Sequence, residues 1–225
     1  MNLAFFVIFS FSLFFLLSCS SKKELISSDG NKSQINNLFT DLKSLVNKNT
    51  QKHDLIKLKL VNDFVNKNIQ WIDDKVIWNK NDYWATPMEV LSKRAGDCED
   101  FSIVKYFTLI SLGVPMDRLK LSYVKLLADN QSHMVLTYFE TNKAVPIILD
   151  NIHKRMKRAS RREDIKPIYS FNDQGIWLQK RHKLGNKIGS TSQLRLWLDL
   201  NKRINKELST ESIKLNFPLI KSDSG

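Results

Sequence analysis

The chain has 225 residues, 42% of which are hydrophobic, and it carries a formal net charge of +12 with a pI near 9.6. This length and hydrophobic content suit one domain with a substantial core and exclude a chain of several large domains. No nucleic-acid-binding motif accompanies the basic charge, so we expect no nucleic-acid partner.

The N-terminus has the features of an export signal. Residues 1–18 carry no charged side chain, and the apolar run from Leu3 to Leu17 is shorter than the roughly 20 residues of a spanning helix. Leu16-Leu17-Ser18-Cys19 resembles the lipobox of bacterial lipoproteins, in which the cysteine is lipidated. We therefore predict a signal peptide over 1–18, a lipidated Cys19 and a periplasmic domain tethered to a membrane. No Lys or Arg precedes the apolar run, so an uncleaved anchor or an ordinary secretory signal remains an alternative.

Two amphipathic helices are predicted after the signal segment. Residues 19–33 are polar, and we expect the lipidated N-terminus to continue there as a flexible tether. Apolar residues then recur at helical spacing from Ile35 to Val46, and a second helix is predicted from about Asp54 to Asn68. We place the folded domain at residues 34–210 and a C-terminal tail at 211–225.

An irregular stretch rich in Asp and Asn follows, with four aromatic rings between Trp71 and Trp84. These rings either line a substrate cleft or cover the core, and the sequence leaves both possibilities open. Thr86-Pro87-Met88-Glu89 then combines an N-cap, a proline at the first helical position and a capping-box glutamate. A short helix is predicted to follow as far as Lys93.

The next helix is predicted to begin at Cys98. Gly96 permits a turn into it, and Asp97 suits the N-cap position. Apolar residues follow at helical spacing as far as Ile110, and Gly113 supplies a glycine stop. This spacing places Cys98 in the first helical turn, with the rest of the helix facing a core.

The charges around Cys98 act in opposite directions. A helix N-terminus favours the thiolate, whereas the neighbouring carboxylates of Asp97, Glu99 and Asp100 raise a thiol pKa. A protonated histidine or a bound hard cation would offset these carboxylates. If Cys19 is lipidated or removed, Cys98 is the only remaining thiol, and it is either a reactive group or a small buried apolar side chain.

Beyond Pro115 the apolar period changes to two. We predict a half-buried strand from Leu119 to Tyr123, followed by strands from His133 to Phe139 and from Val145 to Leu149. A hairpin centred between residues 141 and 142 would place His133 directly opposite Asp150. An imidazole would then meet a carboxylate at the end of the hairpin.

Residues 153–166 contain seven Lys or Arg and two acidic residues. We predict that Lys154 to Arg162 is surface, either as a solvated face or as a basic face for anionic lipid or an acidic protein substrate. A hairpin with its turn at 172–175 and an amphipathic helix from Leu194 to Leu208 follow. The whole order of elements predicts an α+β fold.

A thiol nucleophile needs a base, and the base needs an orienting acceptor. Cys98, His133 and Asp150 supply these three roles in chain order. Of the four histidines, only His133 combines a strand end with a facing carboxylate, and the others are predicted to lie at the surface. A structural histidine bonded to a carboxylate is the competing interpretation.

Several segments resemble the bacterial transglutaminase-like cysteine proteinases of the LapG type. They lie in the order of that family around all three residues of the predicted triad, and the resemblance covers roughly Asp54 to Asn205. The segments are Thr86-Pro87-Met88-Glu89-Val90-Leu91, Gly96-Asp97-Cys98-Glu99-Asp100-Phe101, Lys105-Tyr106-Phe107, Leu112-Gly113-Val114-Pro115, His133-Met134-Val135-Leu136, Ile148-Leu149-Asp150-Asn151 and the hairpin Ser170-Phe171-Asn172 with Gly175-Ile176-Trp177.

The resemblance implies a papain-like, transglutaminase-type fold in which a cysteine-bearing helix packs on an antiparallel sheet. It implies that Cys98 is the nucleophile, His133 the general base and acid, and Asp150 the group that orients His133. Asp97 and Glu99 match the calcium-ligand positions of the family, so calcium is the expected cofactor. Calcium would neutralise carboxylates that oppose thiolate formation, although these residues could also be ordinary acids of a helix N-terminus.

The resemblance also implies a biological role. Family members are calcium-dependent periplasmic proteases that cut large repeat-containing surface adhesins near the N-terminus and so release cells from biofilms. An inner-membrane cyclic-di-GMP receptor of the LapD type sequesters them, and the lipobox departs from a freely soluble member. The alternatives are a transglutaminase-like or cell-wall amide acyl-transfer enzyme, and a non-catalytic lipoprotein that binds a membrane or a partner.

Overall fold

The computed structural model describes residues 28–209 of the chain. The predicted signal peptide, Cys19 and the predicted tail at 211–225 lie outside the described residues. Within residues 28–209, no helix combines the length and the apolar character needed to cross a membrane.

Helices precede most of the strands along the chain. The helices are α1 (Ser28–Asn49), α2 (Asp54–Asn68), α3 (Asp74–Ile77), α4 (Pro87–Lys93), α5 (Cys98–Ser111) and α6 (Arg195–Ser209), with 3-10 helices at Met116–Arg118, Ala159–Arg161 and Thr191–Gln193. The strands are β1 (Gln70–Trp71), β2 (Ala95–Gly96), β3 (Leu119–Leu126), β4 (Ser132–Tyr138), β5 (Ile147–Leu149), β6 (Lys157–Arg158), β7 (Ile165–Asn172), β8 (Gly175–Gln179) and β9 (Leu184–Gly189).

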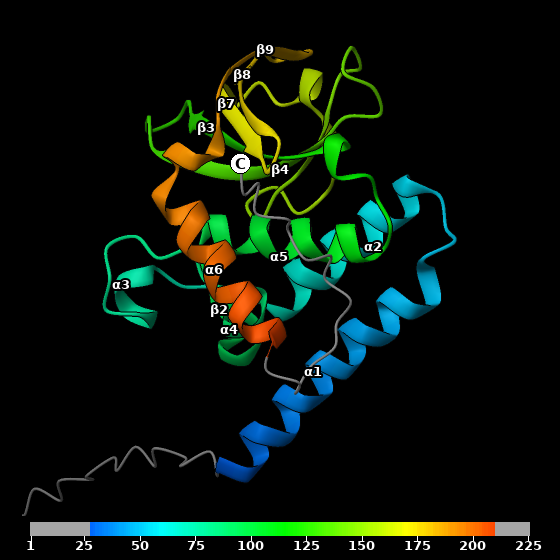
Figure 1. The fold of residues 1–225 in the computed structure, drawn as a ribbon, viewed down its shortest axis with the longest axis vertical. Coiled ribbons are helices and arrows are strands. Elements are labelled where there is room, and N and C mark those ends of the chain that lie inside the picture. Colours follow the sequence, from blue (N-terminus) through cyan, green and yellow to red (C-terminus); the bar gives the residue numbers. More distant parts are fainter. Residues whose placement is uncertain (1–27, 210–225) are drawn as a thin grey trace, which may run out of the picture.

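Seven of these strands form one antiparallel sheet in the order β6-β5-β4-β3-β7-β8-β9, while β1 and β2 form a short parallel pair. Figure 1 shows the sheet at the top of the molecule, with α5, α6, α4 and α2 gathered below it. This arrangement of helices on an antiparallel sheet confirms the predicted α+β fold, in which a cysteine-bearing helix packs on the sheet.

Helix α5 is the centre of the core. Every residue from Phe101 to Leu109 is at most 3% exposed, because the helix contacts β3 and β4 on one side and α2 and α4 on the other. From α6, Trp197 stacks on Phe107 at a centroid distance of 6.0 Å and meets Phe171 of β7 edge-on at 5.4 Å. The buried stretch of α5 is mostly apolar, and the buried polar side chains Ser102, Lys105 and Thr108 interrupt it.

The other face of the sheet is covered as well, which the sequence did not predict. Lys120 and Ser122 of β3 are buried, and Val124 joins a second apolar cluster with Ala159 and Ile165. The prediction of a half-buried strand over Leu119–Tyr123 is therefore wrong. The chain after the edge strand β6 packs onto this outer face through Ala159 and Ile165.

Most local predictions are confirmed at the helices. Helix α2 has the predicted bounds, and Thr86 caps α4 by accepting from the Glu89 N–H at 3.1 Å while the Thr86 N–H donates to Glu89 Oε2 at 2.7 Å. The tether prediction is wrong for residues 28–33, because α1 already begins at Ser28. The apolar period from Ile35 onward therefore marks the interior of this helix and not its start.

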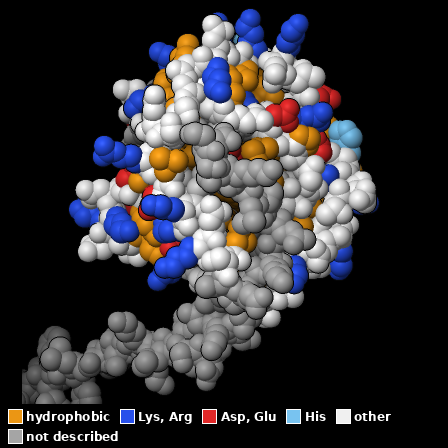
Figure 2. Space-filling model, in the orientation of Figure 1, with side chains coloured by type: hydrophobic (Ala, Val, Ile, Leu, Met, Phe, Trp, Pro, Cys, Tyr) orange, Lys and Arg blue, Asp and Glu red, His pale blue; other side chains and the backbone are white. Residues whose placement is uncertain are grey.

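Charge is spread over the surface. Figure 2 shows Lys and Arg side chains around the whole rim of one face of the molecule, with few acidic side chains among them. They form no single basic patch on this face. This distribution agrees with the interpretation of the +12 charge as a solvated surface.

Candidate functional site

Cys98 is the first residue of α5, and its position is fixed by the residues around it. The Asp97 N–H donates to the Asp100 carboxylate at 3.3 Å, and a Cβ added to Gly96 would lie 2.6 Å from Asp100 Cβ. Gly96 is therefore needed for space beside Asp100, and not for the turn that the sequence analysis assigned to it. Farther along the helix, Ser102 Oγ donates to the Met134 carbonyl at 3.1 Å and holds α5 against β4.

The structure brings Cys98 and His133 together in one cleft. They line an open hollow of about 350 Å³, whose other walls are formed by Trp71, Leu126, Gln131, Ser132, Asn151 and Ile152. Cys98 is partly exposed, and the backbone of Met134, the residue after His133, hydrogen-bonds to its sulfur. A substrate can therefore reach the thiol from solvent.

His133 is bonded to Asp150, as the sequence analysis predicted. His133 Nε2 lies 2.9 Å from Asp150 Oδ1, and both side chains are buried. Burial alone would raise the pKa of Asp150, but the His133 hydrogen bond and the nearby Arg162 guanidinium hold it well below its ordinary value. An ionised carboxylate only accepts, so Nε2 carries the proton and Nδ1 is the nitrogen left for the thiol.

The strand register behind this contact differs from the predicted one. The ladder pairs Leu136 with Leu149 and Tyr138 with Ile147, which moves the hairpin by two positions and removes the direct opposition of His133 and Asp150. Pairing begins only at Ile147 because Pro146 has no N–H to donate. A shift of two keeps each side chain on its face, so His133 still reaches Asp150 diagonally.

The backbone of Asp150 is held from the helix side. Its carbonyl accepts from Asn66 Nδ2 of α2 at 2.8 Å and from Lys105 Nζ of α5 at 3.0 Å, while its Oδ1 accepts from the Ile152 N–H at 3.0 Å. Lys105 is 1% exposed. These contacts fix the chain just beyond β5, where the ladder has ended.

A cluster of carboxylates adjoins Cys98. Ligand oxygens of Asp74, Asp97 and Asp100 lie within 4.8 Å of one another, and so do those of Asp74, Asp82 and Glu99. Burial, followed by the charge of Glu99, raises the pKa of Asp97 to about 9. Such crowding of acids is unfavourable unless a cation neutralises it.

The same cluster acts on the thiol. Cys98 Sγ donates to Glu99 Oε2 at 3.1 Å, and burial together with the charges of Glu99 and Asp97 raises the pKa of Cys98. This effect of the carboxylates on the thiol pKa was predicted from the sequence. Without a counter-charge, the thiolate is strongly disfavoured.

The donor set fits a hard divalent cation. Asp74 Oδ1 and Asp97 Oδ1 are buried and make no hydrogen bond, whereas both Asp100 oxygens accept from backbone N–H groups of Ala85 and Asp97. Calcium takes six to eight oxygen ligands, many of them carboxylate oxygens. Asp74, Asp82, Asp97 and Glu99 could hold such an ion, while Asp100 serves the backbone.

Two members of this cluster, Asp74 and Asp82, were missed by the sequence analysis. They lie in the stretch between Trp71 and Trp84 that was noted only as rich in Asp and Asn. That composition was the available signal. The aromatic rings of this stretch divide between both interpretations, since Trp71 is 57% exposed at the cleft whereas Trp84 is 3% exposed and stacks on Phe171.

The remaining histidines lie away from the cleft residues, as predicted. His53 precedes α2 and accepts from the Leu55 N–H at 3.3 Å, and His182 is exposed. His153 pairs with Asp164 at 3.2 Å. The surface prediction for Lys154 to Arg162 is wrong for Ala159, which is 5% exposed, and for Arg162, which is 1% exposed and lies 2.8 Å from Asp150 Oδ2.

Comparison with known proteins gives one family and one set of solved structures. Residues 36–184 match the family described as bacterial transglutaminase-like cysteine proteinase, BTLCP. Legionella pneumophila LapG is 38% identical with a TM-score of 0.68, over 77% of this chain and 93% of that chain, and its EGTA-treated form gives the same values. Calcium-bound Legionella pneumophila LapG is 36% identical with a TM-score of 0.66, over 80% and 99%. No curated protein matches the chain.

Proposed function

Because the chain belongs to the bacterial transglutaminase-like cysteine proteinases, we propose that it is a calcium-dependent cysteine endopeptidase that uses Cys98, His133 and Asp150. The observation that carries this proposal is the shared cleft of Cys98 and His133, together with the 2.9 Å contact between His133 and Asp150. A chance structural histidine would have no reason to lie beside the one described free thiol.

The geometry supports a definite division of roles. Asp150 fixes the Nε2–H tautomer of His133, so Nδ1 takes the proton of Cys98 as the sulfur attacks the scissile carbonyl. The imidazolium then returns this proton to the leaving amine, and water resolves the acyl-enzyme. The N–H of Cys98 at the start of α5 is one donor for the oxyanion.

The carboxylate cluster is the proposed calcium site. Asp97 and Glu99 would hold the ion together with Asp74 and Asp82, whose ligand oxygens lie within 4.8 Å of that of Glu99. A bound calcium supplies positive charge beside the thiol and so favours the thiolate. Calcium-bound and EGTA-treated forms of Legionella pneumophila LapG support this choice of metal.

The proposed substrate is a large repeat-containing surface adhesin, cut near its N-terminus so that attachment in a biofilm ends. The cleft is open and carries two exposed apolar side chains, Trp71 at 57% and Ile152 at 52%. Such walls suit an extended polypeptide with small or apolar residues at the cut. A macromolecular substrate also explains a nucleophile reached directly from the surface.

The proposed location is the periplasm, with the domain tethered through a lipid on Cys19. An inner-membrane cyclic-di-GMP receptor of the LapD type is the proposed inhibitory partner. A receptor that covers the exposed Trp71 and Ile152 at the cleft would block the substrate path without any change in the triad. Both proposals rest on the family resemblance and on the lipobox.

Digestion of an N-terminal adhesin fragment tests the activity. Protein purified with calcium is expected to release a defined product, and EGTA is expected to stop cleavage until calcium is restored. Cys98→Ala is expected to lower kcat by at least about 10³-fold, because it removes the nucleophile. Equal cleavage by the alanine variant would refute the assignment. The product mass separates hydrolysis from transfer to an added amine, which is the transglutaminase-like alternative.

A further inference from the structure

We propose that Arg162 is a positioning residue for the active site, which fixes the Asp150 carboxylate and through it the tautomer of His133. The inference rests on the proposed function of the triad and adds to it a residue that contacts neither the thiol nor the cleft. The prediction from sequence placed this arginine in a basic surface run. The structure instead buries it against the carboxylate.

The two oxygens of the Asp150 carboxylate have different partners. Oδ1 accepts from His133 Nε2 and from the Ile152 N–H, whereas Oδ2 lies 2.8 Å from Arg162 Nη2. The side chains of Asp150 and Arg162 are 0% and 1% exposed. Because Oδ1 is held by two hydrogen bonds and Oδ2 lies against the guanidinium, the carboxylate has a single orientation toward the imidazole.

Asp164 orients the guanidinium in turn. Arg162 Nε and Nη2 donate to Asp164 Oδ1 and Oδ2, each at 2.8 Å, so the fork is bidentate and planar. Asp164 is 40% exposed and also pairs with His153 at 3.2 Å. The other titratable groups near Asp150 are His133 and Lys105, and the latter contacts only its carbonyl.

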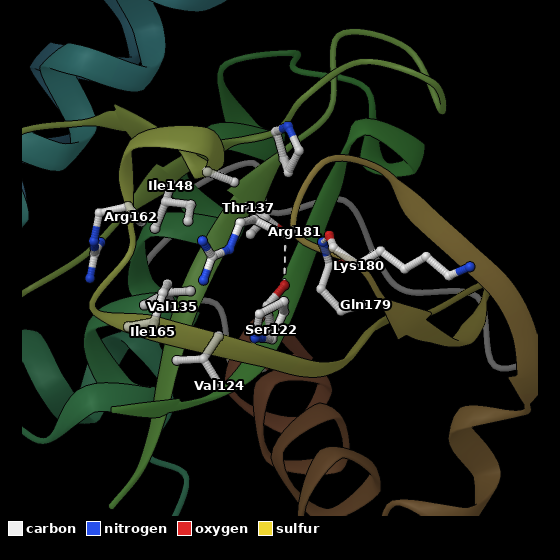
Figure 3. A pocket seen from close by; sticks show the side chains of 13 residues that line it. Ser122, Val124, Val135, Thr137, Ile148, Arg162, Ile165, Gln179, Lys180 and Arg181 are labelled. Atoms are coloured by element: carbon white, nitrogen blue, oxygen red, sulfur yellow. Dashed lines mark hydrogen bonds between the residues drawn. The ribbon is translucent and has the colours of Figure 1, made fainter. Parts of the chain in front are cut away.

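Packing on the outer face of the sheet sets the position of Arg162. Ala159 and Ile165, on either side of it in sequence, are 5% and 3% exposed and pack with Ile148 of β5. A pocket lies on this outer face. Figure 3 shows it, with Arg162 at its edge and the Arg162 guanidinium directed away from the pocket. The charge of Arg162 therefore serves the two carboxylates and not a ligand of the pocket.

A purely structural ion pair and a positioning pair differ in what their loss changes. A structural pair contributes to the free energy of unfolding, and its apolar replacement leaves the imidazole as it was. Oδ2 accepts no hydrogen bond, and Arg162 is the cation beside it. Loss of the positioning pair leaves Oδ2 buried without this counter-charge, so the carboxylate rotates or takes a proton. His133 can then adopt either tautomer, and its Nδ1 is no longer reliably free for the thiol.

Nitrogen NMR of the ¹⁵N-histidine-labelled chain measures this tautomer without any substrate. The wild-type protein with calcium, at a pH where the ring is neutral, is expected to show one tautomer of His133, with the proton on Nε2. Arg162→Met is expected to show a mixture of both. Arg161→Met, an exposed neighbour, is the matched control and should match wild type. The resonance of His133 is identified as the one that is missing from the spectrum of His133→Gln.

Kinetics on the adhesin fragment give the second readout. Arg162→Met is expected to lower kcat by about 10–100-fold with little change in KM. Effects of this size are usual when a residue that orients a functional side chain, such as a metal ligand, is removed. Arg162→Lys keeps the charge but lacks the fork, so its kcat should fall between the two. Arg161→Met should keep the wild-type kcat.

A folded Arg162→Met protein with one His133 tautomer and wild-type kcat would overturn the inference. If this variant does not fold, Arg162→Lys decides, and wild-type values of both readouts would then overturn it. Failure of the proposed proteolysis is seen separately, because the tautomer is measured without substrate. A shifted tautomer in a chain that cuts no adhesin would retain the role of Arg162 and refute only the substrate.

Discussion

Lys105 is a lysine buried in the core beside Asp150. It is 1% exposed, and the only hydrogen bond of its ammonium group among the described residues goes to the Asp150 carbonyl at 3.0 Å. Burial lowers its pKa to about 7, although the charge of Asp150 opposes this shift. Lys105 thus holds the chain beside His133 in place, although burial desolvates its charge.

Lys105→Met is expected to change how stability depends on pH. In the wild type, the native lysine loses its proton near pH 7, whereas the unfolded lysine keeps it to about 10.4. Between these values the unfolded state binds more protons, so the free energy of unfolding rises with pH, by at most about 1.4 kcal/mol per unit. The variant lacks this rise. Urea unfolding at pH 6.5 and 9.5, both in EGTA, measures the difference.

The matched control is Lys67→Met, which removes an exposed lysine from α2. Its stability relative to wild type should be the same at both pH values. If the advantage of wild type over Lys105→Met does not grow from pH 6.5 to 9.5, then the ammonium is not desolvated in the way described.

The site residues differ in how far the sequence could reveal them. Cys98 and its flanking acids could be recognised from the sequence alone, because carboxylates beside a thiol at a helix start raise the pKa of that thiol. Asp74 and Asp82 join the cluster only through the path of the irregular segment, which no local signal specifies. Arg162 was assigned to the surface because a basic run is normally solvated, and its burial depends on Asp150, which the fold brings from the end of β5, as well as on the nearby Asp164.

At the level of elements, α4 joins two parts of the fold through its cap. Thr86 is fully buried, and its hydroxyl accepts from the Glu89 N–H at 3.1 Å and donates to Glu207 of α6 at 2.7 Å. Arg203 of α6 also reaches α4, with Nη1 2.6 Å from Glu89 Oε2. The short helix is therefore clamped to the C-terminal helix.

Thr86→Ala is expected to lower the free energy of unfolding by about 1–3 kcal/mol, because it removes the cap and leaves the Glu207 carboxylate without this donor. Thr86→Ser retains the hydroxyl and should cost less than about 1 kcal/mol. Urea unfolding of both variants measures this. An equal loss in both would assign the effect to the methyl group and contradict the account of the cap.

The elements themselves were largely predictable, and their register was not. Caps, helical periods and alternation are local, so α2, α4, α5 and the strands β3 and β4 were predicted close to their observed bounds. The β4–β5 hairpin was misplaced by two residues because its loop depends on Pro146 and on the core below. The bend that buries Ala159 and Ile165 on the outer face is set by packing alone.

For the whole molecule, the acidic cluster links metal binding to stability. It joins α3, the loop before α4 and the start of α5, which are separate along the chain. A cation bound there ties these segments together only in the folded state. Folding and metal binding should therefore be coupled.

Calcium at about 100 times its Kd is expected to stabilise the protein by about 2.7 kcal/mol, which raises Tm by about 5–10 °C for a domain of this size. Asp97→Asn should lose most of this rise, because it removes a charge from the cluster. Asp117→Asn, an exposed acid elsewhere, should retain the rise in full. Differential scanning calorimetry with calcium and with EGTA measures it, and an unchanged calcium response in Asp97→Asn would remove that residue from the site.

The antiparallel pair that carries His133 and ends at Asp150 is buried on both faces, with Leu136 and Leu149 on one side and Val135 and Ile148 on the other. Side chains therefore set the alignment of the two strands, together with the buried Phe139 and Pro146, and residues 140–145 link these two ends. Evolution can lengthen, shorten or decorate this connection while the imidazole keeps its acid. The contact between His133 and Asp150 therefore does not depend on the length of this loop.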